Sequence, residues 1–269
     1  MKAFFRFLLR RAYFKGQYRL FFLLYRKKML QYNTPIIAKP LKGDFRIYCD
    51  TKTIIGAEIY YMGEYEDYIK ATFEKEIEVG NTVLDIGANI GFHTLFFSEL
   101  VKQKGKVIAF EPVEYNYDNL TKNIELNNYS NIVTHQLALG DSNETISINA
   151  NKDDINPGSF SLFKKGDLKI NVIIGDEFIN EKIDFIKIDV EGYELFTFMG
   201  LKNTIQQYKP KIVFEFDKTY QLKSSDNPFA IFELLADIGY IFFEIKREGI
   251  YRIEIPFKMT SCDVLALIK

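Results

Sequence analysis

Short apolar runs alternate with stretches of helical periodicity along most of this chain. An apolar strand that begins at residue 83 leads into a glycine turn and a helix over about 91–102, and a second strand follows at 106–111. A helix over roughly 114–127 and a strand at 132–136 continue the alternation. Buried strands separated by helices are typical of a parallel sheet with helices on both faces, so the pattern predicts an α/β fold.

The rest of the chain repeats this pattern with one interruption. Residues 144–175 show two exposed strands around an NPGSFS loop, an insertion that could shape the acceptor site of an enzyme. The other expected elements are a strand over 45–50, a helix over 65–78, a fourth core strand before Asp189, a fifth at 211–216, a helix over 229–238, a hairpin with its turn near Glu248 and Gly249, and a last strand at 263–268.

Length and composition fit one large domain. With 269 residues and 47% hydrophobic content, the chain can bury a sizeable core. We expect an N-terminal arm over 1–43, a lead-in strand and helix over 44–79 and a main domain over 80–269. The two cysteines are far apart in sequence and form no metal or redox motif, which fits a reducing, cytoplasmic compartment.

The glycine turn carries the first chemical signal. Asp85, Gly87 and Gly91 lie where a buried strand passes into a helix, the place where open α/β sheets bind ligands. Glycine permits positive φ and close approach of a ligand. The dinucleotide fingerprint needs a glycine where Asp85 stands, and a carboxylate there would repel a pyrophosphate. We therefore expect a cofactor without a pyrophosphate, although such a turn also occurs for packing alone.

An acidic residue ends the second strand. Glu111, followed by Pro112, lies about 20 residues beyond the glycines, a spacing suited to hydrogen bonds with a ribose hydroxyl pair. The alternative is a helix N-cap or a solvated strand end.

A third signal lies at the end of the fourth strand. Lys187, Asp189 and Glu191 occupy every second position, so they share one face for as long as the strand persists. Ionisable groups beside a buried strand are costly unless they are paired or used. A structural Lys–Asp pair is the alternative to a functional site.

Five segments together resemble the FkbM family of S-adenosylmethionine (SAM)-dependent methyltransferases. They are DIGANIGFHT at 85–94, FEP at 110–112, ALGD at 138–141, KIDVEGYE at 187–194 and VFEF at 213–216. The resemblance covers roughly residues 80–245. It implies a class I methyltransferase (Rossmann-like) fold, with a mostly parallel seven-stranded sheet flanked by helices, and methyl transfer, most often to a hydroxyl. The N-terminal helical extension lies outside it.

Position along the fold then suggests how SAM is held. The segment Gly87, Ala88, Asn89 and Gly91 is expected to wrap the amino-acid portion, with Asp85 acting on it electrostatically or through water. Glu111, beside Pro112, would take the ribose. Asp141 is placed to meet the adenine amino group, unless it only completes a Gly-Asp turn.

Several groups could activate an acceptor hydroxyl, which must lose its proton. The candidate bases are Asp189, Glu191 and Glu215, which end neighbouring strands. Alternatively, Asp189 and Glu215 share a divalent cation that lowers the pKa of the hydroxyl. Lys187 would neutralise the carboxylates or anchor the acceptor. His93 could be the base instead, or could serve only packing.

Charge is distributed unevenly. Residues 1–43 hold eleven Lys or Arg and no acid, whereas the remainder holds 24 basic and 36 acidic side chains. Within the arm, apolar and basic residues mix at near-helical spacing on either side of Gly16. The longest apolar run there, Leu20 to Tyr25, is too short to span a bilayer, and no signal-peptide pattern is visible. Residues 1–30 either pack on the domain or make peripheral contact with the inner face of a membrane.

These observations favour a SAM-dependent O-methyltransferase acting on a sugar, glycan or secondary-metabolite hydroxyl. The alternative is a non-catalytic SAM-fold protein that binds a partner through its basic arm. No nucleic-acid acceptor is expected, because the body is acidic and no Asn/Asp-Pro-Pro-Tyr/Phe tetrapeptide is present.

Overall fold

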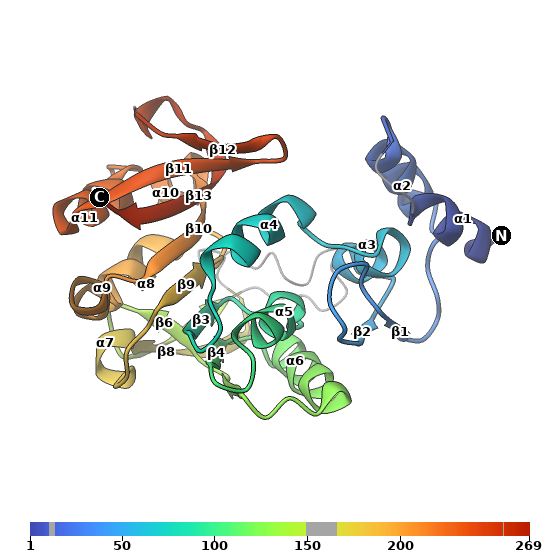
Figure 1. The fold of residues 1–269 in the computed structure, drawn as a ribbon, viewed down its shortest axis with the longest axis horizontal. Coiled ribbons are helices and arrows are strands. Elements are labelled where there is room, and N and C mark those ends of the chain that lie inside the picture. The colour runs from blue at the N-terminus through green and yellow to red at the C-terminus, as the bar shows by residue number, and fades with distance from the viewer. Residues whose placement is uncertain (11–13, 149–165, 255) are drawn as a thin grey trace.

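The fold was determined as a computed structural model (Figure 1). The structure describes residues 1–10, 14–148, 166–254 and 256–269. The NPGSFS loop expected within 144–175 therefore lies outside the described residues.

A large mixed sheet forms the centre of the molecule. Its parallel strands are β3 (Thr82–Ile86), β4 (Lys106–Phe110), β5 (Ile132–His135), β9 (Phe185–Ile188) and β10 (Lys211–Asp217). The antiparallel β13 (Ser261–Ile268) lies between β10 and β11 (Tyr240–Lys246), and the whole order is β12-β11-β13-β10-β9-β3-β4-β5. The class I methyltransferase fold is confirmed. The expected seven strands are extended to eight, because β12 (Gly249–Arg252) of the predicted hairpin also pairs with β11.

Alternation along the strands builds a separate core on each face of this sheet. Leu84, Ile186 and Phe214 face one core, which is covered by α8 (Glu194–Gly200), α9 (Lys202–Tyr208) and α11 (Ala230–Ile238). Val83 and Phe185 face the other core, which is covered by α4 (Asp67–Glu76) and α5 (Phe92–Val101). The helix α6 (Glu114–Asn127) has the predicted bounds, while α8 and α9 were not predicted.

A second, three-stranded sheet lies beside the large one. Its strands are β6 (Ala138–Gly140), β7 (Glu144–Ile148) and β8 (Leu168–Ile174), in the order β6-β8-β7, and α7 (Gly175–Phe178) follows. The two strands predicted within 144–175 are present as β7 and β8, but they are not simply exposed, because Ile148, Ile170 and Val172 are buried.

The N-terminal part is more helical than expected. It contains α1 (Lys2–Leu9), α2 (Gln17–Arg26), β1 (Ile36–Ala38), β2 (Ile47–Cys49) and α3 (Ile54–Met62). Neither β1 nor α3 was predicted. In Figure 1, α1 and α2 lie beside α3, at the opposite end of the molecule from α11. No helix among the described residues is long and apolar enough to cross a bilayer. The remaining elements are α10 (Lys218–Ser224) and a 3-10 turn at Pro256–Lys258.

Candidate active site

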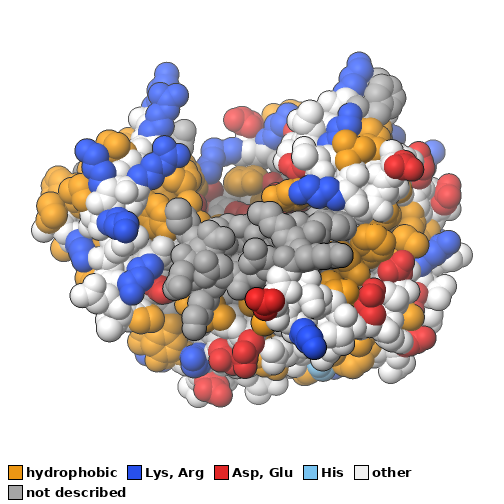
Figure 2. All heavy atoms as spheres, turned by 180° about the vertical axis from the view of Figure 1, so that it is seen from behind, with side chains coloured by type: hydrophobic (Ala, Val, Ile, Leu, Met, Phe, Trp, Pro, Cys, Tyr) orange, Lys and Arg blue, Asp and Glu red, His pale blue; other side chains and the backbone are white. Residues whose placement is uncertain are grey.

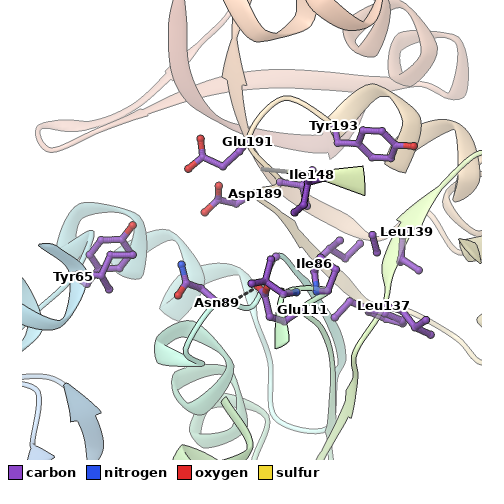
Figure 3. Close-up of a pocket in the computed structure, with 17 residues that line it drawn as sticks. Tyr65, Ile86, Asn89, Glu111, Leu137, Leu139, Ile148, Asp189, Glu191 and Tyr193 are labelled. Carbon is purple, nitrogen blue, oxygen red and sulfur yellow. Dashed lines mark hydrogen bonds between the residues drawn. The ribbon is translucent and has the colours of Figure 1, made fainter. Parts of the chain in front are cut away.

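A cleft opens at the carboxyl ends of three neighbouring strands and encloses about 720 Å³, part of it open to solvent. Gly87 and Asn89 follow β3, Glu111 follows β4, and Asp189 and Glu191 follow β9 (Figure 3). The parallel order β9-β3-β4 brings these segments together, although Gly87 and Asp189 are about 100 residues apart in the chain. The expected site at the strand ends is therefore present as a cavity.

One wall of the cleft is apolar. Its members come from β4 and the segment after it, the β5–β6 connection, the second sheet and the loop before α8, and they are Phe110, Val113, Leu137, Ala138, Leu139, Ile148 and Tyr193. In Figure 3, Leu137, Leu139 and Tyr193 lie away from the carboxylates of Asp189 and Glu191. Such a wall suits a flat, weakly polar ring, because it gives contact area without unsatisfied polar groups.

The glycine turn has the backbone that the sequence predicts, for a reason the sequence did not show. Gly87 has φ +81° and Gly91 has φ +89°. A Cβ on Gly87 would lie 1.9 Å from the carbonyl oxygen of Asp189, and one on Gly91 would lie 2.6 Å from Cδ1 of Leu120. Packing of the chain on itself thus requires glycine at position 87, where the clash is with backbone, whereas the contact at Gly91 is with the end of a side chain.

Glu111 both orders the turn and lines the cleft. Its carboxylate accepts hydrogen bonds of 2.9 Å from the backbone N–H groups of Asn89 and Val113, and the residue is only 5% exposed. Burial raises the pKa of Glu111 to about 7. A carboxylate has about four acceptor positions, so further hydrogen bonds from a ligand remain available.

Asp85 and Asp141 lie away from the cleft surface. Asp85 is fully buried beneath the turn, where Thr94 Oγ1 donates to it at 2.5 Å. Asp141 is exposed, and neither residue is among those lining the cleft. Any effect of Asp85 on a ligand is therefore electrostatic, and direct contact of Asp141 with a ring in the cleft finds no support.

Lys187 connects the strand ends. Its ammonium lies 3.2 Å from Asp189 Oδ2, 3.2 Å from the Gly87 carbonyl oxygen and 3.8 Å from Asp85 Oδ1. Burial alone would lower the pKa of Lys187, but the charges of Asp189, Asp85 and Glu66 raise it above its ordinary value. Lys187 is thus a buried, permanently charged group.

The three ionisable residues do not share one strand face. Because β9 ends at Ile188, Lys187 is on the strand and Asp189 and Glu191 lie on the loop that follows. Glu191 has φ +53°, an uncommon backbone for a residue with a side chain. Glu194 holds this loop, because its buried carboxylate accepts from the N–H groups of Val190 and Gly192.

Asp189 is surrounded by other carboxylates. We call Glu66, Asp189, Glu191, Glu215 and Asp263 the acidic cluster. Asp189 lines the cleft and two smaller cavities beside it, one of which also contains Glu66, Glu215 and Asp263. Burial, followed by the charge of Asp189, raises the pKa of Glu191 to about 8 and that of Glu215 to about 9.

Burial also raises the pKa values of Glu66 and Asp263 to about 7. Sequence reasoning missed both residues, and also Tyr65, which lines the cleft. Glu66 and Asp263 lie outside the segments of family resemblance and belong to no motif, so no local signal could have placed them here. Within the described ranges, no three His, Cys, Asp or Glu side chains are positioned to hold a metal ion. The shared divalent cation expected at Asp189 and Glu215 therefore finds no support.

His93 is enclosed by aromatic rings. Its Nε2 lies 2.9 Å from Glu66 Oε2, and Phe73, Phe92 and Phe97 pack around the imidazole. Burial, followed by the charge of Lys187, lowers the pKa of His93 to about 3. An imidazole with so low a pKa is a weak base, so packing accounts for His93 better than proton transfer does.

The Methyltransferase FkbM domain family matches residues 85–242, which is more than half of the chain. The chain belongs to the FkbM methyltransferase family. This match begins at Asp85 and ends inside β11, so it contains the glycine turn, Glu111, Asp189 and Glu215.

Two curated relatives of this FkbM protein are methyltransferases by name. The hexuronic acid methyltransferase AglP of Haloferax volcanii is 31% identical over 152 residues, covering 55% of this chain and 61% of that protein. Methyltransferase 1 of Beauveria bassiana is 23% identical over 188 residues, covering 60% of this chain and 74% of that one. The match thus spans about three fifths of the length of the Haloferax protein.

A solved FkbM methyltransferase from Methylobacillus flagellatus KT superposes with a TM-score of 0.43 at 19% identity, covering 78% of this chain and 52% of that one. The strand order described above shows the fold without this likeness.

Proposed function

We propose that this FkbM protein transfers a methyl group from SAM to a hydroxyl group of a sugar. The observation that carries the proposal is one cleft in which Glu111 and Asp189 both line the cavity and an apolar wall adjoins them. The relative named as a hexuronic acid methyltransferase supports a sugar as the acceptor class.

The residues of the cleft fit SAM. Glu111 offers carboxylate oxygens for ribose hydroxyls, and the apolar wall offers contact area for the adenine ring. The segment from Gly87 to Gly91 would hold the amino-acid portion. Asp189, which lines the cleft, offers a negative charge that would favour the positive charge of SAM. Bound SAM supplies an electrophilic methyl group on its sulfonium.

Asp189 is the best candidate for the base. A neutral hydroxyl must lose its proton as it attacks, and a carboxylate positioned at the acceptor can accept that proton. Lys187 holds Oδ2 of Asp189, and we assign to Oδ1 the role of accepting the proton. Glu191 and Glu215 are weaker candidates, since pKa values of about 8 and 9 keep both largely protonated at neutral pH.

The charge of the site favours a hydroxyl over a carboxylate acceptor. The cavities around Asp189 are lined by several carboxyl groups and by one cation, Lys187, which is already paired with Asp85 and Asp189. The negative charge of Asp189 would repel an acceptor carboxylate, whereas a neutral hydroxyl would gain a proton acceptor. A hexuronic acid offers both groups, so the transferred methyl would form an ether rather than an ester.

Isotope-labelled SAM tests the reaction directly. The purified chain is incubated with SAM and a panel of neutral and hexuronic acid-containing saccharides, and products are analysed by mass spectrometry before and after mild alkali. An added methyl group that survives alkali supports ether formation on a hydroxyl, whereas an alkali-labile methyl group would show transfer to a carboxylate. SAM binding without transfer to any saccharide would contradict the proposed acceptor and favour the non-catalytic alternative.

A chelator belongs in the same assay. Because no metal-binding group is found among the described side chains, we expect transfer to continue in its presence. Contact of residues 1–30 with a membrane surface is a separate proposal, which the methyl transfer does not require.

A further inference from the structure

The arm formed by α1 and α2 is fixed to the domain through one face only. Leu9, Phe21 and Leu24 are buried against Ala57 and Tyr61 of α3, in a cluster that also contains Tyr25, Leu30 and Met62. The inner face of the arm therefore packs on the domain, which is one of the two alternatives from the sequence.

Polar contacts lock the same geometry. The guanidinium groups of Arg6 and Arg10 donate to the carbonyl oxygen of Tyr60 at 3.2 and 3.3 Å, and Gln17 Nε2 donates to the Leu9 carbonyl oxygen at 2.7 Å. Two cations of the arm, Arg6 and Arg10, are thus engaged with the domain. The same contacts hold the outer face of the arm in a defined orientation.

The outer face combines apolar and cationic side chains. On α2, Arg19, Phe22, Leu23 and Arg26 are exposed at the spacing i, i+3, i+4 and i+7, which places them on one side of the helix. Phe4 of α1 is 61% exposed and Leu23 is 52% exposed. Phe7 of α1 and the residues Lys15, Lys27 and Lys28, which flank α2, are exposed as well.

No negative charge within the arm offsets these cations, because residues 1–43 contain no Asp or Glu. Figure 2 views the molecule from behind Figure 1, so the arm lies at its left, where hydrophobic and Lys or Arg side chains mix on the surface. Large apolar side chains with a ring of cations are complementary to an anionic lipid surface, where the apolar groups enter the headgroup layer and the cations meet phosphates.

The arm also has a fixed relation to the cleft. It packs on α3, and Ile55 in the first turn of α3 lines the cleft itself. The arm and the cleft therefore share α3 as a common neighbour.

We propose that the outer face of α1 and α2 docks the protein on an anionic membrane surface. The consequence for the reaction, which rests on the proposed function, is that the acceptor is presented at that surface. The docking itself needs no catalysis and is tested without it.

Flotation with vesicles tests the docking on the full chain. Binding to vesicles of phosphatidylcholine with phosphatidylglycerol is compared with binding to phosphatidylcholine alone. We expect binding to the anionic vesicles only. It should fall at least tenfold when salt is raised from about 0.1 M to about 1 M, which shortens the screening length from about 10 Å to about 3 Å.

Two double variants separate the contributions of charge and apolar contact. Arg19→Gln with Arg26→Gln, and Phe4→Ser with Leu23→Ser, should each reduce binding about tenfold or more, because cations near an anionic surface and inserted apolar groups both contribute. Their melting temperatures should match the parent, since all four side chains are exposed.

Matched controls come from the rest of the surface. Lys104→Gln with Lys202→Gln, and Val79→Ser with Leu222→Ser, alter equally exposed side chains far from the arm in sequence and should leave flotation unchanged. Failure of the full chain to float, or equal loss in the control variants, would overturn the proposal. Suppose that the full chain does not float, and that it is a dimer in size-exclusion chromatography which only the arm variants convert to a monomer. This result would overturn the proposal in favour of contact between two copies.

Discussion

Lys187 Nζ lies 3.2 Å from Oδ2 of Asp189, two residues further along the chain. The last ionisable residue on β9 thereby holds the first residue of the loop that forms the cleft, and the same ammonium contacts the Gly87 carbonyl oxygen and lies near Asp85. The structural Lys–Asp pair and the functional site were alternatives from the sequence. In the structure, the pair positions the side chain that we propose as the base.

Removal of this cation should be costly. We expect Lys187→Met to lower the free energy of unfolding by about 3 kcal/mol at neutral pH, because it leaves the buried Asp85 without its positive partner. Chemical denaturation measures the loss. Lys182→Met is a matched control, since Lys182 also pairs with an Asp two residues on but at the surface, and it should change stability little. Equal losses in the two variants would mean that the buried pair has no special role.

Asp189→Asn should stop catalysis and spare cofactor binding. Loss of a general base reduces turnover by roughly 10²–10⁴-fold, while SAM affinity in calorimetry should stay nearly unchanged. Glu215→Gln resembles the protonated Glu215 of the native state, whose pKa is about 9, and should retain most activity. Asp118→Asn, an exposed change on α6, controls for loss of an acid. Normal turnover by Asp189→Asn would assign the base elsewhere.

Glu111 should contribute to recognition of the ribose hydroxyl groups of the cofactor. We expect the parent protein to bind S-adenosylhomocysteine at least tenfold more tightly than its 2′-deoxy analogue, because a charge-assisted hydrogen bond is lost in the analogue. Glu111→Gln should weaken both ligands, since its carboxylate also orders the glycine turn. If Glu111 contacts the ribose, the ratio between the two affinities should be smaller in the variant than in the parent. An unchanged ratio of affinities would limit Glu111 to holding the turn.

Gly87 should tolerate a side chain far less than a glycine with similar φ in open space. Gly239→Ala, at φ +105° with no atom within 4 Å of the new Cβ, should cost only the left-handed strain of about 1–2 kcal/mol. Gly87→Ala adds a clash 1.9 Å from the Asp189 carbonyl oxygen, so its loss of stability should be more than twice as large. Denaturation of the two variants measures the difference. Similar losses would show that the loop after β9 yields easily.

Stability should decrease as pH rises across the neutral range. The pKa of Glu215 is raised from 4.5 to about 9 by burial and then by the charge of Asp189, so the native state keeps a proton that the unfolded chain releases. Between about pH 4.5 and pH 9 the native state therefore binds more protons, and its free energy of unfolding falls as pH increases.

Glu215→Gln should flatten this dependence. The variant lacks the group that must ionise, so its free energy of unfolding should fall less steeply than that of the parent between pH 4.5 and pH 9, by up to about 1.4 kcal/mol for each pH unit. Melting temperatures across pH 5–9 measure the slope, with Glu125→Gln on the exposed side of α6 as the control. A parent curve without decline in this range would contradict the burial of a protonated Glu215.

The sequence determined the main sheet, the glycine turn and two of the strand ends that carry candidate functional side chains. Apolar runs such as residues 106–110, bounded by polar residues and helical patterns, specify strands locally, because burial on both faces needs continuous hydrophobic side chains. Positive φ at Gly87 and Gly91 was likewise predictable, since few other residues adopt it.

Only the tertiary structure decided which groups surround Asp189. Glu66 arrives from the N-terminal segment and Asp263 from the last strand, where it is paired in register with Glu215. The reason that Gly87 must be glycine also lies about 100 residues away, at the Asp189 carbonyl. Periodicity reports which side of an element is buried, but not which distant element buries it. The pKa values of about 7 to 9 follow from that burial and from mutual repulsion, so they exist only once the chain has folded.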